Sequence, residues 1–136
     1  MDRTKELQQR LAGFFPDVLG IRLTRAEPDA VHAELTVRED LCTVPGILHG
    51  GALMAFADTL GAVGTALNLG PGQGTTTIES KTNFFAPGRT GATITAECLP
   101  LHRGRQTMVW QTTVRGPDGR MLAQVTQTQI VIQAAS

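Results

Sequence analysis

The sequence predicts an α+β fold in which one long helix packs on an antiparallel sheet of about six strands. Residues 49–69 keep the apolar spacing of a helix and end at a run of glycine and proline. Six other segments alternate apolar and polar residues or are rich in β-branched residues, as strands are. The two layers share one core, so the sheet is expected to wrap around the long helix, with a short N-terminal helix beside an edge.

The first part of the chain predicts a short helix and two strands. The helix is expected from Asp2, a capping residue, to about Phe14, and Pro16 is expected to stop it. Strands are expected over residues 18–25 and 30–37, because apolar side chains recur there at alternate positions. A Glu-Pro-Asp turn separates the two strands.

An irregular connection, the long helix and four more strands are expected to follow. Residues 38–48 contain a Pro-Gly pair, which favours irregular structure. The helix then runs to about Leu69, where a Gly-Pro-Gly-Gln-Gly run ends it. A Gly-Pro-Asp-Gly turn predicts that the last two strands form a hairpin. The four strands are expected at residues 75–85, 92–101, 106–115 and 121–133.

The long helix carries two different faces. One face is apolar, and the other consists of small residues and one aspartate. Small residues allow close approach of a second helix or a ligand, and aspartate is a poor residue inside a helix. Asp58 is therefore a candidate functional residue, and a solvated surface carboxylate is the alternative. An apolar stripe, expected to face the sheet, consists of Leu53, Phe56, Leu60, Val63 and Leu67. A second face consists of Gly51, Ala55, Asp58, Ala62 and Thr65.

The long helix opens on His49-Gly50-Gly51. Glycines leave the backbone N–H groups of a helix N-terminus open to an incoming oxygen atom, so this segment predicts a binding site for such an atom. The alternative is a close-packed turn, for which glycine is equally suited. In that case His49 is a capping or packing residue.

Composition limits the classes of function. The 136 residues predict one domain, residues 1–136, with its core at about residues 18–133. Twelve basic and twelve acidic residues give a formal net charge of zero, which offers no attraction to nucleic acid or an anionic membrane. The two cysteines and three histidines lack the spacing of a zinc site, so no metal is expected and both thiols are expected to be reduced.

Signals for export or membrane insertion are not expected in this sequence. The first residues are charged and have no apolar core, which does not fit a signal peptide. No run of eighteen apolar residues occurs, so no membrane-spanning helix is expected. A cytoplasmic location is the resulting expectation.

The segment from Pro45 to Thr59 resembles the active-site segment of the hotdog-fold acyl-CoA thioesterases. It is most similar to the branch that contains the phenylacetyl-CoA and 4-hydroxybenzoyl-CoA thioesterases. In that branch a His-Gly-Gly opens the central helix and an acidic residue follows nine positions after the histidine, as Asp58 follows His49 here. The resemblance covers about residues 18–133 and implies hydrolysis of an acyl-CoA or aroyl-CoA thioester to the free carboxylic acid and CoA.

The same resemblance implies roles for five residues. The Gly50 N–H would polarise the thioester carbonyl, and Asp58 would act as general base or as nucleophile. Thr77 matches a family Ser or Thr that helps to hold the water or the carboxylate. Thr43 stands where the family often has Asn or Gln, six residues before the histidine. His49 is expected to shape the helix entrance rather than to transfer protons.

Four further residues are candidates for contact with the CoA part of the substrate. Arg89, Arg103 and Arg105 lie at predicted strand ends or turns, where a forked guanidinium can bind phosphate. His102 begins a turn that also resembles the family. The alternative for each arginine is a solvated surface charge. No cofactor is expected, since CoA belongs to the substrate.

Helix geometry predicts that the site is shared between two chains. Gly50 and Asp58 are eight residues apart, which is roughly 12 Å along an α-helix. One thioester cannot contact both, because a donor and a base must each lie about 3 Å from the reacting atoms. Two antiparallel helices from two chains bring Gly50 of one near Asp58 of the other, so a homodimer or a dimer of dimers is expected.

Two other functions remain as alternatives. A hotdog dehydratase or hydratase needs a histidine and an acid that meet across the dimer, and the chain has no histidine just before Pro45. A non-catalytic acyl-CoA-binding module would bind the same ligand without turnover. A serine hydrolase of the α/β-hydrolase class is disfavoured, because no nucleophile elbow is present. The acyl group itself does not follow from the sequence.

Overall fold

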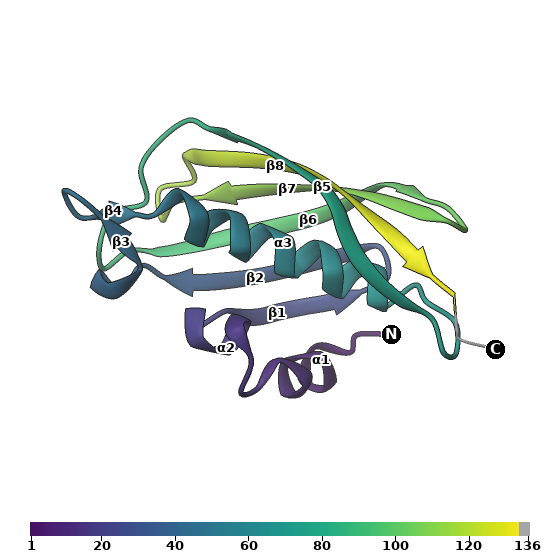
Figure 1. The fold of residues 1–136 in the computed structure, drawn as a ribbon. Coiled ribbons are helices and arrows are strands. Elements are labelled where there is room, and N and C mark those ends of the chain that lie inside the picture. The colour runs from purple at the N-terminus through teal and green to yellow at the C-terminus, as the bar shows by residue number, and fades with distance from the viewer. Residues whose placement is uncertain (134–136) are drawn as a thin grey trace.

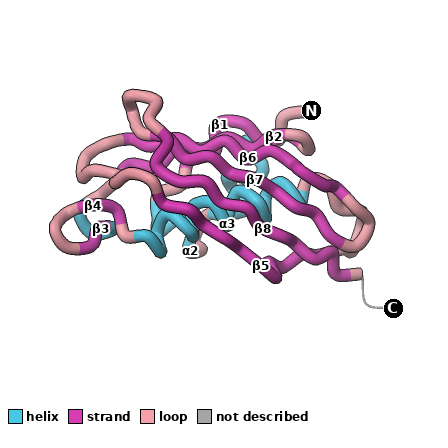
Figure 2. Tube along the Cα trace, turned by 90° about the horizontal axis from the view of Figure 1, so that it is seen from above, coloured by secondary structure: helices cyan, strands magenta, loops and turns pink. Residues whose placement is uncertain are grey.

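The computed structural model of the chain describes residues 1–133. Within these residues, six antiparallel strands form one sheet in the order β1-β2-β6-β7-β8-β5, and the helix α3 (Gly50–Ala66) packs on one face (Figure 1). Seen from above, the strands cross over α3 (Figure 2). The strands are β1 (Arg22–Glu27), β2 (Ala30–Thr36), β5 (Gly74–Phe84), β6 (Thr93–Arg103), β7 (Thr107–Arg115) and β8 (Met121–Ile132).

The apolar stripe of α3 forms the centre of the core, as predicted. Phe56 and Leu60 have no exposed surface, and the other three members of the stripe are also buried. Trp110 on β7 lies opposite, equally buried, and its Nε1 donates a hydrogen bond of 2.8 Å to Thr65 Oγ1. Thr65 was expected on the face of small residues, and this placement is wrong because its hydroxyl satisfies the indole N–H inside the core.

Two glycines of α3 allow large side chains of the sheet to approach the helix. A Cβ atom on Gly64 would lie 2.8 Å from the Trp110 ring, and a Cβ atom on Gly61 would overlap the amide of Gln127. Both contacts are closer than packed side chains tolerate. The small residues of α3 therefore serve the helix–sheet interface as well as the outer face.

The N-terminal segment differs from the prediction. Two helices, α1 (Thr4–Leu11) and α2 (Phe15–Leu19), replace the single helix and the beginning of the expected strand at residues 18–25. Pro16 does not stop a helix but lies in the first turn of α2, where a missing N–H costs nothing. Gly20, with φ 79°, then ends α2 in the left-handed conformation.

The connection before α3 is more ordered than expected. It contains a 3₁₀ turn, η1 (Glu39–Leu41), and a two-stranded ladder of β3 (Cys42–Thr43) and β4 (Ile47–Leu48). Gly46, with φ 121°, lies in the turn between these strands. An isolated bridge from Ile47 to Arg89 ties the ladder to the loop after β5. This anchoring holds the start of α3 in place.

The other predicted strands are confirmed, and their ends differ by at most two residues from the expected positions. Strands β7 and β8 form the expected hairpin. No helix within residues 1–133 is long and apolar enough to cross a membrane.

Candidate active site

The N-terminus of α3 is capped by a histidine side chain. The Gly51 N–H donates to Nδ1 of His49 over 2.8 Å, so the proton of the neutral ring lies on Nε2. The backbone of His49 is also held, because its N–H donates to the Leu41 carbonyl at 2.9 Å. The structure therefore places His49 at the helix entrance as a cap.

Gly50 supplies the backbone N–H that this cap leaves free. Of the first four N–H groups of α3, that of Gly51 binds the His49 ring, and those of Ala52 and Leu53 bind the His49 carbonyl. Within residues 1–133, the Gly50 N–H makes no hydrogen bond. A helix N-terminus with one unused donor can accept a carbonyl oxygen that gains negative charge.

A phenyl ring lies beside Gly50. A Cβ atom on Gly50 would lie 3.2 Å from Cζ of Phe84, the last residue of β5. About half of the Phe84 side chain is exposed, so the ring forms an apolar wall beside the free N–H. Phe84 was not singled out from the sequence, although its exposed position at a strand end next to Phe85 was a usable signal.

Asp58 lies two turns further along α3 and is partly buried. Thr77 on β5 donates a hydrogen bond of 2.6 Å from Oγ1 to Asp58 Oδ1. Two of the sequence-predicted site residues are thus in direct contact, although they come from different elements. Asp58 Oδ2 makes no hydrogen bond within the described part of the chain, so it is free to meet a substrate or a water molecule.

Thr77 is in turn bound by the side chain of Gln129, which was not among the predicted site residues. Gln129 Nε2 on β8 donates to Thr77 Oγ1 at 2.5 Å. Gln129 is completely buried, as is its neighbour on the same face, Gln127. The available signal was their position in the strand: they share the inward phase of Val125 and Val131, where an apolar residue is expected.

Thr43 does not join this group. It lies exposed in β3, and within residues 1–133 its side chain makes no hydrogen bond to Gly50, Asp58 or Thr77. Its carbonyl accepts the Gly46 N–H at 2.7 Å, which closes the turn of the ladder. The contacts of Thr43 in one chain are therefore those of a turn residue.

The candidate residues for CoA lie at the two opposite ends of the sheet. Arg89 follows β5, near the start of α3, whereas His102 and Arg103 end the eleven-residue strand β6 at the far end (Figure 1). Arg105 lies in the following turn. Arg103 Nη1 donates to the Pro28 carbonyl at 3.3 Å. One chain does not bring these four residues together.

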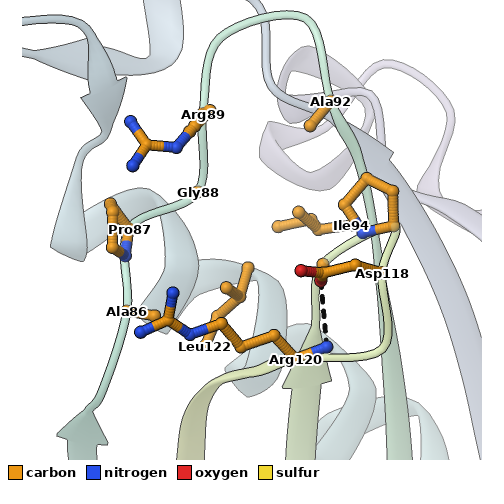
Figure 3. A pocket seen from close by; sticks show the side chains of 11 residues that line it. Ala86, Pro87, Gly88, Arg89, Ala92, Ile94, Asp118, Arg120 and Leu122 are labelled. Atoms are coloured by element: carbon orange, nitrogen blue, oxygen red, sulfur yellow. Dashed lines mark hydrogen bonds between the residues drawn. The ribbon is translucent and has the colours of Figure 1, made fainter.

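Arg89 shares a pocket of about 290 Å³ with a second arginine, Arg120 (Figure 3). The two guanidinium groups come from the loop after β5 and the turn between β7 and β8. The pocket floor is apolar, with Ile94 and Leu122 among its lining residues. Asp118 also lies here, and its Oδ1 accepts the Arg120 backbone N–H at 3.0 Å. Neither arginine forms a salt bridge within residues 1–133, so both charges are available to an anion.

The described residues 1–133 contain no candidate metal site, and the thiol of Cys98 is buried. No group of three His, Cys, Asp or Glu side chains in residues 1–133 is placed to hold a metal ion. Burial raises the pKa of the Cys98 thiol to about 12, against a smaller opposing effect of the nearby Thr112 side chain. Cys98 is thus protonated at neutral pH and is a packing residue, not a nucleophile.

The fold and this site define a hotdog domain of the thioester-hydrolysing class. The family model of the thioesterase superfamily matches residues 45–123, which include the whole of α3 and the strands β5, β6 and β7. The chain belongs to the thioesterase superfamily. The predicted hotdog fold and the predicted class of enzyme, a thioester hydrolase, are both confirmed.

Relatives and solved structures agree with this assignment. The chain is 37% identical over 102 residues to the proofreading thioesterase EntH of Klebsiella pneumoniae, an alignment that covers 75% of this chain and 74% of EntH. A thioesterase from Haemophilus influenzae superposes with a TM-score of 0.91 at 27% identity, covering 98% of this chain and 92% of that one. The PaaI protein of the E. coli phenylacetic acid degradation operon has the same fold, with a TM-score of 0.84 at 21% identity, covering 98% and 94%.

Proposed function

We propose that the protein hydrolyses an acyl-CoA or aroyl-CoA thioester to the free carboxylic acid and CoA, at sites shared between two chains. The observation that carries the proposal is the separation of two functional groups along α3. A free Gly50 N–H stands at the helix N-terminus, and the Thr77-bound carboxylate of Asp58 stands eight residues further on. Hydrolysis of a thioester needs both kinds of group, one for the carbonyl oxygen and one for the attacking water.

In the proposed reaction, the Gly50 N–H of one chain binds the carbonyl oxygen and stabilises the negative charge that develops on it. Asp58 of the partner chain takes a proton from the water that attacks the acyl carbon, or it attacks this carbon itself. The bond between carbon and sulfur then breaks, and the CoA thiolate leaves and is protonated. Where Asp58 has attacked the carbon itself, the acyl group remains on its carboxylate as a mixed anhydride, and a water molecule then hydrolyses this anhydride to the free acid. No separate cofactor takes part, since CoA belongs to the substrate.

The edge of the sheet supports the proposed dimer. Strand β5 has eleven residues and lies at the edge, so the backbone groups of its outer side have no strand partner within the described residues. Ile78 in this strand is 56% exposed, and the hydroxyls of Ser80 and Thr82 are buried without a hydrogen-bond partner in residues 1–133. A long exposed edge is a template for pairing with another chain.

Pairing of two β5 edges also explains why the site lies there. Thr77 belongs to β5 and Asp58 contacts it, so a partner strand would run directly past the carboxylate. The two α3 helices would then lie antiparallel across a twofold axis, which gives two equivalent sites. We propose a homodimer, which a second interface can extend to a dimer of dimers. The two free cysteines, Cys42 and Cys98, suit a reducing compartment such as the cytoplasm.

The experiment that tests the function measures release of free thiol from a panel of CoA esters with short aliphatic, long aliphatic and aromatic acyl groups. We expect hydrolysis of at least one class, with a preference that identifies the acyl group. Tight binding of CoA esters without release of thiol would contradict the proposal and favour a binding module. Hydration of an enoyl-CoA, followed by absorbance, would favour the hydratase alternative.

Replacement of Arg89 or Arg120 by alanine is expected to raise KM for CoA esters by about tenfold while kcat stays within about twofold. The reason is that a guanidinium in this pocket would bind a CoA phosphate before and during the reaction alike. The matched comparison uses an acyl-N-acetylcysteamine, which lacks the nucleotide and its phosphates. If KM for this shortened substrate rises equally in the variants, the arginines do not bind phosphate.

A further inference from the structure

Two glutamines are buried at inward-facing positions of β8, where apolar residues are expected. Gln127 and Gln129 are 1% and 0% exposed, and both point from the sheet toward α3. A buried primary amide is costly unless its donors and its acceptor are all hydrogen-bonded. The bonds that these two amides make therefore indicate why the chain keeps them.

The amides form a continuous chain of hydrogen bonds that starts and ends on α3. Gln127 Nε2 donates to the Ala57 carbonyl at 3.0 Å, and Gln127 Oε1 accepts from Gln129 Nε2 at 3.0 Å. Gln129 Nε2 also donates to Thr77 Oγ1, and Thr77 Oγ1 donates to Asp58 Oδ1 at 2.6 Å. Ala57 and Asp58 are adjacent, so the chain closes a loop through the sheet.

The direction of every bond in this loop is fixed by its first acceptor. A backbone carbonyl such as that of Ala57 can only accept, so Gln127 must turn its NH₂ group toward it. Gln127 Oε1 then faces Gln129, so Gln129 must donate to it from its own NH₂ group. The second hydrogen of that group goes to Thr77 Oγ1, so the hydroxyl hydrogen is left to point at Asp58. If the Gln127 amide were flipped, its Oε1 would face the Ala57 carbonyl oxygen, and two acceptors would meet without a hydrogen between them.

Two further contacts surround the amides. The Thr75 hydroxyl lies 3.0 Å from Gln129 Oε1 and 2.9 Å from the Ile130 carbonyl, and its single hydrogen is shared between these two acceptors. Gly61 has no side chain where Gln127 approaches the helix, and a Cβ atom there would overlap the amide. The two amides are therefore tightly enclosed between β8 and α3, and such enclosure favours a single geometry for a buried polar network.

We infer that Gln127 and Gln129 are positioning residues for Asp58, which they orient through the hydroxyl of Thr77. The inference rests on the proposed function, because it assumes that the Asp58 carboxylate acts on the substrate. The network holds Asp58 Oδ1 as an acceptor and leaves Oδ2 for the reaction. Catalytic groups must be held within a fraction of an ångström, and supporting hydrogen bonds supply that precision.

The test replaces Gln129 with Met, which has a similar volume but no amide. We expect kcat to fall by about tenfold or more and KM to change by less than about twofold, because the substrate still binds but the carboxylate loses its fixed orientation. In a background that carries Thr77→Val, the same replacement is expected to have almost no further effect on kcat, since the hydroxyl that links the Gln129 side chain to the Asp58 carboxylate has been removed. Thr77→Ser, which keeps the hydroxyl, is expected to retain most of the activity.

Thr65→Val is the matched control. It removes a buried hydrogen bond of similar kind, that of 2.8 Å between Trp110 and Thr65, at the same helix–sheet interface. This bond has no connection to Asp58, so we expect a lower melting temperature with kcat unchanged. If Gln129→Met behaves like Thr65→Val, or if its effect on kcat simply adds to that of Thr77→Val, the glutamines are structural and the inference is overturned.

Crystal structures of the same variants separate this inference from the proposed function. In Gln129→Met we expect the 2.6 Å contact between Thr77 and Asp58 to be lost or the carboxylate to occupy more than one rotamer, whereas Thr65→Val keeps both. If the wild-type protein hydrolyses no thioester but Asp58 still loses its orientation in Gln129→Met, the function fails and the positioning stands. If thioesters are hydrolysed and Asp58 keeps one orientation in Gln129→Met, the positioning fails alone.

Discussion

Replacement of Asp58 by Asn is expected to lower kcat for thioester hydrolysis by about 10² to 10⁴. An amide has nearly the shape of the carboxylate and can still accept the Thr77 hydroxyl, but it can neither take a proton from water nor attack the acyl carbon. The loss therefore reports the chemistry of the carboxylate rather than a change of packing. Steady-state kinetics with the best CoA ester of the panel measures it.

The control for this variant is Asp29→Asn, in the exposed turn between β1 and β2. It removes the same charge outside the candidate site and is expected to leave kcat unchanged. Retention of the full rate in Asp58→Asn would remove the carboxylate from the mechanism. Thermal unfolding of both variants excludes a loss of folded protein as the cause.

Replacement of Gly50 by Pro is expected to lower kcat by about 10² to 10³, the scale measured when one oxyanion donor is removed. Proline lacks the backbone N–H but is well tolerated at the first position of a helix, which Gly50 occupies. The preceding residue, His49, is already extended with ψ 134°, as a residue before proline must be. The substitution thus deletes a single donor and preserves the helix.

Gly50→Ala separates the lost donor from added bulk. Alanine keeps the N–H but carries a Cβ atom, which would lie 3.2 Å from the Phe84 ring. We expect Gly50→Ala to remain far more active than Gly50→Pro, because the exposed ring can shift. Equal losses in the two variants would show that steric crowding, not the missing N–H, causes the effect.

The parts of the fold that were predictable from sequence are those in which apolar residues recur at a regular spacing over many residues. The stripe that includes Phe56 and Leu60 identified the buried face of α3, and alternation placed five of the strands within two residues of their observed ends. The N-terminal segment failed because Pro16 can stop a helix or begin one, and only packing decides between these. Local sequence gives no information on that choice.

Most of the residues proposed for the site share one helix, whereas Thr77 comes from a different element. His49, Gly50 and Asp58 were found because a fixed spacing along α3 relates them, and that spacing alone indicated two chains. The family resemblance implied that Thr77 helps to hold either the water or the carboxylate, and in the structure its hydroxyl donates to Asp58 over 2.6 Å. The inward phase of Gln129 in its strand was visible in the sequence, but its contact with Thr77 was not, because this contact depends on how β8 pairs with β5.

The central claim is that each site takes Gly50 from one chain and Asp58 from the other. The direct test mixes two inactive variants, Asp58→Asn and Gly50→Pro, and lets their subunits exchange by joint refolding. In a mixed dimer, one site combines the intact Gly50 of the first variant with the intact Asp58 of the second, and the other site carries both defects. Random mixing of equal amounts is expected to restore about a quarter of the wild-type activity, since half of the dimers are mixed and each has one working site.

Each variant refolded alone is the control and is expected to stay inactive. Recovery of about a quarter of the activity on mixing would show that the site is completed by the partner chain. A mixture that forms dimers, as size-exclusion chromatography of differently tagged chains would show, yet stays as inactive as its components would contradict the shared site.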